Sequence, residues 1–300
     1  MADDRWDALF DRVASLLALA EQALRDHVGA PPDADRFEHV HAFRWVVRGG
    51  RGRLVAIEEP QHFDLDDLVG VERAVARLVA NTEQFLAGHP SNHVLLHGER
   101  GTGKSSAVKG LLTRYAHRGL RLVEVHKRDL QELPEVLDAL RDARHRFLLF
   151  CDDLSFDLGE TGFRELKAAL EGSLVAPPAN VRIVATSNRR HLLPESVADN
   201  RDARLDEHGD LHMGETVDEK LALSDRFGLS LGFYPFDQAT YLAIVDHHAR
   251  KAGVRAPTPR LHEEALRFAL HRSSRSGRTA KHFVDDFAGR EALARDRGGK

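Results

Sequence analysis

Short apolar runs and helical periodicities alternate through the middle of the chain. The runs at 94–96, 120–125, 147–151 and 181–185 have the length and composition of buried strands. Between them, apolar residues recur every three or four positions, at 107–115, 133–143 and 163–170, as in helices that cover a sheet. The alternation predicts an α/β fold of three layers, with a parallel sheet between two layers of helices.

The two ends of the chain depart from this alternation. At residues 6–24 the apolar residues share one face of a predicted helix, which we expect to pack on its own domain rather than on a neighbouring subunit. Pro31-Pro32 ends that helix, and Gly49–Gly52 predicts a loop. After a short strand at 229–233, Pro235 opens a tail with three helical patterns. We therefore divide the chain into an N-terminal helical region (1–60), an α/β domain (61–235) and a helical lid domain (236–300).

Composition narrows the class of protein. The chain has 300 residues, of which 42% are hydrophobic, so it can bury one large core or two smaller ones. The formal net charge of −4 gives no global field for nucleic acid, although a local basic patch is compatible with it. A single cysteine, Cys151, and the lack of a signal-like start or a membrane-length apolar run predict a soluble, cytoplasmic protein without membrane contact.

Residues 199–220 form an acidic interruption. Eight acidic residues stand there against three basic ones, with few apolar residues between them. Such a composition predicts a mobile loop.

The stretch from Gly98 to Ser105 fits the phosphate-binding pattern G-x-x-x-x-G-K-[ST], between a predicted strand and a predicted helix. Glycines allow the backbone N–H groups to point inward at a phosphate, and the dipole of the following helix favours the same anion. Lys104 is expected to reach the β- and γ-phosphates, and Ser105 to ligate Mg²⁺. The predicted nucleotide-binding residues here are Gly98, Glu99, Arg100, Gly101, Thr102, Gly103, Lys104, Ser105 and Ser106. A chance match in a glycine-rich turn is the alternative.

Two carboxylates, Asp152 and Asp153, follow the buried strand at 147–151. At the carboxyl end of a parallel strand they are expected to lie beside the phosphate-binding loop. Asp152 would then hold Mg²⁺, usually through water, and Asp153 would orient the attacking water. The alternative for both is a solvated pair that caps a turn.

Polar residues also follow the strand at 181–185, where Asn188 is a candidate to contact the γ-phosphate or the attacking water. The alternative for Asn188 is a buried polar turn. Upstream, the backbone of Leu68, Val69 and Gly70 is a candidate cradle for an adenine ring, with a capped helix start as the alternative.

In this order the motifs resemble the AAA+ ATPases over residues 63–290. More narrowly, the chain resembles an uncharacterised bacterial domain-of-unknown-function family of AAA-type ATP-binding proteins. The stretches that carry this resemblance are Asn81–Gly88, Cys151–Phe156, Ala185–Leu192, Ser224–Leu229 and Ser276–Ala280. The resemblance implies a P-loop NTPase domain of AAA+ type with a C-terminal lid.

The resemblance also implies roles for single residues. Leu68, Val69 and Gly70 match the adenine-side segment, and Asn188 matches the first sensor. Arg226 matches an arginine finger that reaches the nucleotide of a neighbouring subunit, and Arg278 matches the second sensor in the lid. A surface arginine is the alternative for both, and Arg189 and Arg190 are weaker candidates for contacts between subunits. A finger acting on a neighbour implies a homo-oligomer.

One departure from the wider AAA+ pattern concerns Asp153, which stands where most of these proteins have Glu. The shorter side chain predicts slow hydrolysis or another base, for which Glu160 is a candidate. The leading hypothesis is an ATPase that uses ATP and Mg²⁺ to remodel an unidentified protein partner. The alternatives are a nucleotide-dependent switch or scaffold with little turnover, and a nucleic-acid-directed loader, suggested by basic residues near the C-terminus but not favoured. The eighteen histidines lack the spacing of a metal site.

Overall fold

A computed structural model describes residues 12, 13, 15, 36–156, 161–171, 177–188, 204–205, 211–212 and 224–298. The predicted helix at 6–24 lies outside this part except for residues 12, 13 and 15, which are helical. Most of the acidic stretch 199–220 also lies outside it, as do Glu160, Arg189 and Arg190. Among the described residues, none of the helices has the length and apolar character needed to cross a bilayer.

The centre of the molecule is a seven-stranded sheet in the order β2-β1-β4-β5-β6-β3-β9. All neighbouring strands are parallel except the β1–β2 pair. The strands are β1 Ala42–Arg48, β2 Arg51–Ile57, β3 Val94–Gly98, β4 Leu120–Glu124, β5 Arg146–Cys151, β6 Val181–Ser187 and β9 Leu229–Phe233. A separate antiparallel pair joins β7 (Arg204–Leu205) to β8 (Leu211–His212).

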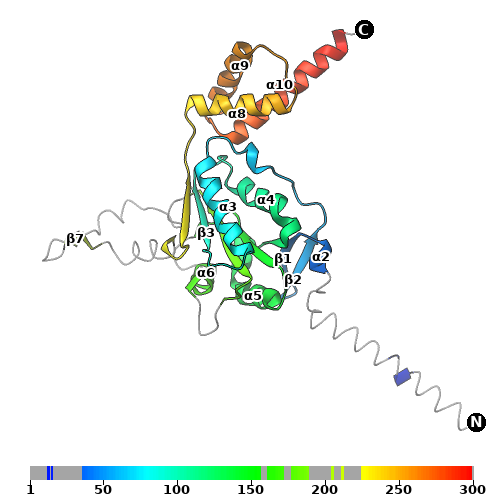
Figure 1. Ribbon diagram of the computed structural model, residues 1–300, viewed down its shortest axis with the longest axis vertical. Coiled ribbons are helices and arrows are strands. Elements are labelled where there is room, and N and C mark those ends of the chain that lie inside the picture. The colour runs from blue at the N-terminus through cyan, green and yellow to red at the C-terminus, as the bar shows by residue number, and fades with distance from the viewer. Residues whose placement is uncertain are drawn as a thin grey trace, which may run out of the picture.

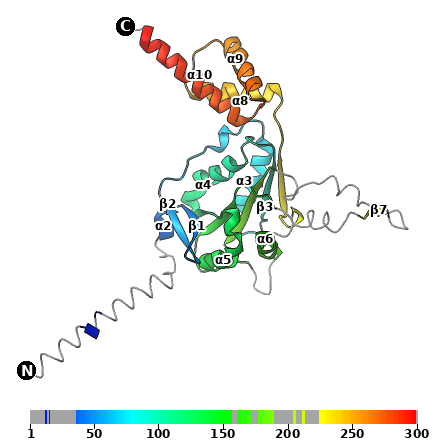
Figure 2. The same ribbon diagram turned by 180° about the vertical axis from the view of Figure 1, so that it is seen from behind.

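Helices cover both faces of this sheet, as the alternating pattern predicts (Figures 1 and 2). The α-helices of this part are α2 Arg36–His39, α3 Glu72–Leu86, α4 Lys104–Tyr115, α5 Leu133–Arg141 and α6 Thr161–Glu171. Short 3₁₀ helices are η1 Leu65–Asp67, η2 Ala116–Arg118 and η3 Lys127–Glu132. Helices α3 and α4 lie on one face, and α5 and α6 lie on the other.

Strand β5 shows why its sequence is apolar without interruption. Phe147, Leu149 and Cys151 point to the core under α5 and α6, whereas Leu148 and Phe150 point to the core under α3 and α4. Successive side chains of a strand alternate between faces, so a strand covered on both sides needs apolar residues at every position. Cys151 is fully buried at the end of this strand, and burial raises the pKa of its thiol to about 12.

Residues 42–57 correct the expectation of a purely helical N-terminal region. They form the antiparallel hairpin β1–β2, and β1 pairs with β4, so the hairpin extends the main sheet. Gly49 and Gly50 make its two-residue turn with φ angles of 59° and 73°, the positive values that such tight turns require. Trp45 packs over Gly52, where an added Cβ would lie 1.9 Å from the indole ring. The boundary near residue 60 itself stays a prediction.

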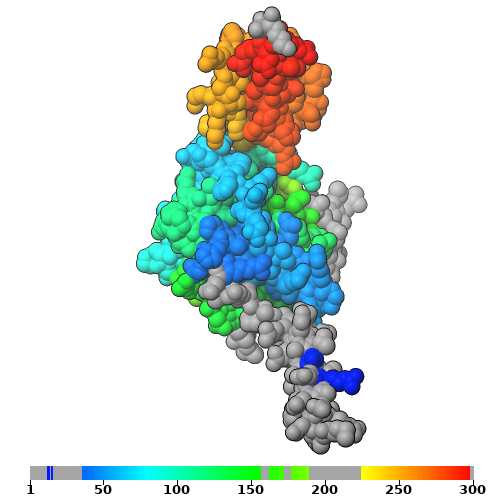
Figure 3. Space-filling view, turned by 90° about the vertical axis from the view of Figure 1, so that its right-hand side faces the viewer, coloured from blue at the N-terminus to red at the C-terminus, as the bar shows by residue number. Residues whose placement is uncertain are grey.

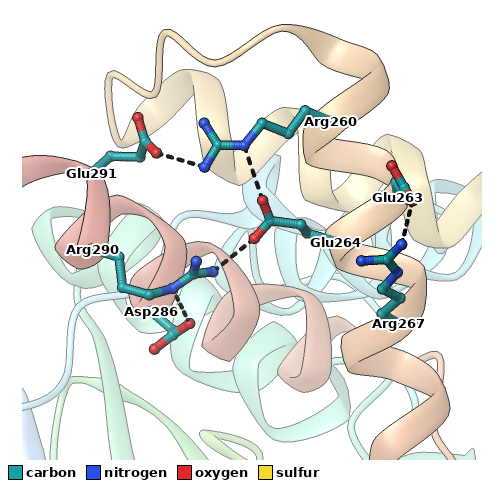
Figure 4. Close-up of polar contacts among 7 residues, drawn as sticks. All are labelled: Arg260, Glu263, Glu264, Arg267, Asp286, Arg290 and Glu291. Atoms are coloured by element: carbon teal, nitrogen blue, oxygen red, sulfur yellow. Dashed lines mark hydrogen bonds and ion pairs between the residues drawn. The ribbon is translucent and has the colours of Figure 1, made fainter. Parts of the chain in front are cut away.

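The C-terminal helices form a unit with its own core. They are α8 Gln238–Lys251, α9 Thr258–His271 and α10 Gly277–Gly298, and they lie together beyond one edge of the sheet (Figure 1). Tyr241, Phe283 and Phe287 are fully buried among them. On the surface, Arg260 and Arg290 both donate to Glu264, each over 3.0 Å, which links α9 to α10 (Figure 4). Because these ion pairs are exposed, the buried rings contribute more to stability.

We predict that His93 makes folding stability depend on pH. Its Nδ1 accepts a hydrogen bond from the N–H of Ile183 over 2.9 Å, and burial lowers the pKa of the imidazole from 6.5 to about 4. In the unfolded chain His93 therefore binds a proton below about pH 6.5. In the folded chain it binds one only below about pH 4. The contribution of His93 is complete above pH 6.5 and is lost as the pH falls toward 4.

Urea unfolding at pH 7 and pH 4.5 measures this loss, which we expect to be about 2 kcal/mol for this residue. The control is His93→Asn, which retains an acceptor but does not titrate. A free energy of unfolding that depends on pH equally in the wild type and in this variant would contradict the prediction.

Candidate functional site

The loop between β3 and α4 has the backbone conformation that the sequence pattern predicts. Gly98 has φ 127°, and a Cβ there would lie 2.0 Å from the carbonyl oxygen of Phe233 on β9. Gly103 has φ 104° immediately before α4, and a Cβ there would lie 2.5 Å from the Leu68 side chain. Both positions therefore require glycine.

Lys104 is the first residue of α4 and is only 6% exposed. Its ammonium group donates to the carbonyl oxygens of Gly98 and Glu99 over 2.8 and 2.7 Å. It also donates to the Asn188 amide oxygen over 3.1 Å. Burial lowers the pKa of Lys104, and neighbouring carboxylates, first that of Asp153, act in the opposite direction. The loop thus holds a cation at a fixed place next to the helix N-terminus.

The end of β5 brings the two carboxylates to this loop. Ser105 donates to Asp152 over 2.7 Å. The Thr186 hydroxyl, from β6, also donates to Asp152 over 2.5 Å and accepts from the Asp153 N–H over 2.8 Å. Thr186 is 1% exposed, so this hydroxyl is a fixed bridge between the two acidic residues.

Asp153 has φ 53°, in the left-handed region where Asp is enriched among non-glycine residues. Its carboxylate accepts a hydrogen bond from the Asn188 side-chain nitrogen. Asn188 therefore contacts the second carboxylate with one end of its amide and Lys104 with the other. The three side chains form one hydrogen-bonded group at the carboxyl ends of β3, β5 and β6.

A cavity of about 730 Å³ opens at this group. Its walls come from the phosphate-binding loop, from the segment at 61–69 and from the lid. Predicted site residues that line it are Leu68, Val69, Arg100, Gly101, Thr102, Gly103, Lys104, Ser105, Ser106, Asp152, Asp153, Asn188 and Arg278. The volume and the mixture of apolar and charged walls suit a ligand of nucleotide size.

Four predicted site residues lie elsewhere. Gly98 and Glu99 do not line the cavity, although their carbonyl groups hold Lys104. Gly70 instead sits against the lid, because a Cβ there would lie 2.4 Å from Thr240. Arg226 also lies outside the cavity and pairs with Glu171 on α6.

The lid supplies lining residues that the sequence analysis did not identify. Phe236, Ile244 and His248 line the cavity, together with Gly277, Lys281 and His282. Burial lowers the pKa of His248, which favours its neutral form. Gln61, Phe63, Asp67 and Thr186 are further lining residues that were missed. Only Thr186 had a local signal, since it follows a predicted strand beside Asn188.

Polar contacts fasten the lid over the cavity. Asp67 in η1 accepts from Lys251 over 2.7 Å and contacts His247 over 2.9 Å, both at the end of α8. On the other side, the Arg278 N–H donates to the Gly101 carbonyl over 3.3 Å. The lid therefore contacts both the segment at 61–69 and the loop between β3 and α4.

The donors present fit a hard divalent cation at one place. Ser105 and Asp152 offer oxygen atoms already in contact with each other, and oxygen is the ligand that Mg²⁺ prefers. In the part of the chain that the structure describes, no group of three or more His, Cys, Asp and Glu side chains is arranged to hold a metal ion. The oxygen pair at the loop is thus the metal candidate that the geometry offers.

Comparisons with known proteins give a family and a fold. The sequence profile of the family described as "Protein of unknown function (DUF815)" matches residues 38–291. No curated protein matches the chain. Among solved structures, the RuvB Holliday junction branch migration motor of Thermotoga maritima is similar, with 18% identity and a TM-score of 0.49. A threonine-to-valine variant of the same protein gives 18% identity and a TM-score of 0.50.

In both structures the match covers 74% of this chain and 63% of the other, so this chain spans less than two thirds of their length. At this identity the similarity shows the fold alone. The fold is α/β and like that of P-loop NTPases, with the helix-covered parallel sheet that the sequence pattern predicts.

We predict that Thr186→Val lowers the free energy of unfolding by about 1–3 kcal/mol, because the swap keeps the volume but leaves the partly buried Asp153 N–H without its acceptor. Urea denaturation measures it. The matched control is Thr82→Val: Thr82 is 2% exposed, and its hydroxyl donates to the helical carbonyl of Leu78. Since that carbonyl lies within α3, we expect the control to lose less than about 1 kcal/mol. Equal losses in the two variants would refute the bridging role.

Proposed function

The chain belongs to the DUF815 family, and we propose that it binds ATP with Mg²⁺, hydrolyses it, and couples hydrolysis to the remodelling of a protein partner. The observation that carries the proposal is the hydrogen-bonded group of Lys104, Asp153 and Asn188 at the mouth of a nucleotide-sized cavity. Cation, carboxylate and amide converge where three parallel strands end, as phosphoryl transfer requires.

Binding would divide between the two sides of the cavity. The N–H groups of the phosphate-binding loop and the Lys104 ammonium, which line the cavity, would hold the phosphates. Leu68 and Val69 on one wall, with Ile244 of the lid on the other, offer apolar surface for the base. The Arg278 guanidinium, which lines the same cavity from the start of α10, supplies a fork of donors for a phosphate oxygen.

Hydrolysis follows from the same arrangement. Asp153 and Asn188 would orient a water molecule whose oxygen forms a bond to the γ-phosphorus, while the bond from that phosphorus to the bridging oxygen of ADP breaks. The proton of the water passes to the Asp153 carboxylate. Mg²⁺, which Ser105 and Asp152 would hold, supplies positive charge to the phosphate oxygens.

Arg226 is proposed as a finger for the nucleotide of a second copy, since it does not line the cavity of its own chain. Its Nη1 is buried without a hydrogen-bond partner among the described residues, and its Nε donates to Glu171. For Arg226 to reach the nucleotide of a second copy, its contact with Glu171 must break and the protein must form a homo-oligomer. We place this assembly in the cytoplasm, because the single cysteine fits a reducing compartment.

A nucleotide-dependent switch with little turnover is the second candidate function. The observation in its favour is that the Asp153 carboxylate is already bound by Asn188, which competes with a water molecule for the same oxygen. In this version ATP binding changes the contacts of the protein with its partner without hydrolysis.

Lys104→Ala is expected to abolish ATP binding, with a loss of affinity of at least 100-fold, because a buried cation at the phosphates is removed. Fluorescence of a labelled ATP analogue measures the affinity. The control is Lys167→Ala on α6, outside the cavity, which should bind as the wild type does. Unchanged affinity in Lys104→Ala would remove the central assignment.

Asp153→Asn is expected to leave ATP affinity within about threefold of the wild-type value and to lower the turnover rate at least 100-fold, because the amide cannot accept the proton. A phosphate-release assay together with a mass measurement, with and without nucleotide, tests turnover and assembly. Absence of turnover in the wild type would favour the switch. Wild-type turnover that persists in Asp153→Asn would exclude Asp153 as the base.

A further inference from the structure

One face of the β1–β2 hairpin is rich in arginine. The register places Arg44 opposite Val55, Val46 opposite Arg53, and Arg48 opposite Arg51. Since side chains alternate along strands, these six residues share one face. All four arginines are exposed. The face begins at the pair Ala42 and Ile57, which packs in the core under α3 and α4, and it leaves that core toward the turn.

The opposite face of the hairpin fixes its orientation. Phe43, Trp45 and Leu54 are buried in the core on the α5 side of the sheet. A shift of the strand register by one residue would expose these apolar side chains to water and bury the arginines in the core. The register is therefore strongly specified. The arginine face therefore points outward, because the opposite face of the hairpin is buried in the core.

Among the described residues, only one of the four arginines has an ionic partner. Arg44 donates to Glu124 of β4 over 2.6 Å. In contrast, Arg48, Arg51 and Arg53 form no ion pair with any residue that the structure describes. The nearest acidic residues along the hairpin, Glu58 and Glu59, follow β2 at the end away from the turn.

The hairpin places Arg48 directly across from Arg51. Like charges opposite each other destabilise a strand pair, so this arrangement has a cost in the isolated protein. A polyanion that lies along the face would remove the repulsion. No hairpin residue lines the cavity at the phosphate-binding loop, so this surface is separate from the proposed ATP site.

The hairpin is also accessible from outside. β2 is an edge strand of the sheet, and Gly49 and Gly50 at its turn are exposed. In Figure 3 the blue surface of this part of the chain faces the viewer below the lid.

We propose that the arginine face binds the phosphate backbone of duplex nucleic acid through Arg48, Arg51 and Arg53. A guanidinium group can form two parallel hydrogen bonds with the oxygens of one phosphate, and the hairpin carries three such groups on one face. Within the hairpin, the only aromatic residues, Phe43 and Trp45, are buried on the opposite face, so unpaired bases find no stacking platform.

Binding of this kind is independent of base sequence. An acidic protein segment would need an apolar anchor pocket at the centre of its interface. The face offers only the half-buried Val46 and Val55 between the arginines.

The test is the salt dependence of binding to a short fluorescein-labelled DNA duplex, followed by fluorescence anisotropy with the full chain. Three phosphate contacts contribute about −2.7 to the slope of log K against log [KCl], at about 0.9 per contact. Between 50 and 200 mM KCl they lower the affinity by roughly 40-fold. We expect the triple variant Arg48→Gln/Arg51→Gln/Arg53→Gln to lose this part of the slope and to bind at least tenfold more weakly at 50 mM KCl.

Two further variants test whether binding depends on the arginine face. The single variant Arg51→Gln should make the slope shallower by about 0.9. The control Arg73→Gln/Arg77→Gln/Arg255→Gln removes the same charge from exposed sites on α3 and after α8, and should bind duplex as the wild type does. All variants should bind the labelled ATP analogue equally, since none of these residues lines the cavity.

The inference fails if the wild type shows no salt-dependent duplex binding, or if the control loses as much affinity as the hairpin variant. It fails equally if the hairpin variant binds duplex normally but changes the mass of the assembly, since the face would then contact protein.

Discussion

The hydrogen bonds that join Lys104 to Asn188 and Ser105 to Asp152 depend on the order of strands in the sheet. Lys104 and Asn188 are 84 positions apart, and Ser105 and Asp152 are 47 apart. They meet because β6 lies between β5 and β3 and all three run in the same direction. The sheet thus sets the spacing of the charged groups, and the apolar cores on both faces keep it rigid.

The same constraint explains the chemistry of Asp153. The backbone leaves β5 through a left-handed residue, and the Thr186 hydroxyl fixes that turn by accepting from its N–H. Asp adopts this conformation more readily than Glu does. Asp153 therefore agrees with the local backbone, and the contact with Asn188 shows where its carboxylate lies. The lid has its own core, separate from this group.

The sequence predicted those parts of the structure for which a local pattern exists. The buried strands, their covering helices, the phosphate-binding loop, Asp152 and Asn188 follow from runs of residues and their order. The hairpin at 42–57 was missed, although Phe43, Trp45 and Leu54 alternate with arginines and Gly49-Gly50 is a turn signal. The lid residues Phe236, Ile244 and His248 had no signal, because their place on the cavity depends on how the lid docks. Contacts between residues that are far apart in the sequence produce no local pattern of apolar and polar positions.

The state of Cys151 makes the distance between the lid and the sheet measurable. Its thiol is fully buried in β5, and its raised pKa leaves almost no thiolate at neutral pH, so thiol-directed dyes will not react with it in the folded protein. The chain can therefore be labelled at introduced cysteines without first replacing Cys151. One cysteine introduced on the exposed surface of α9 and another on α3 would carry a donor and an acceptor fluorophore. The distance between these two labels could then be followed as nucleotide is added.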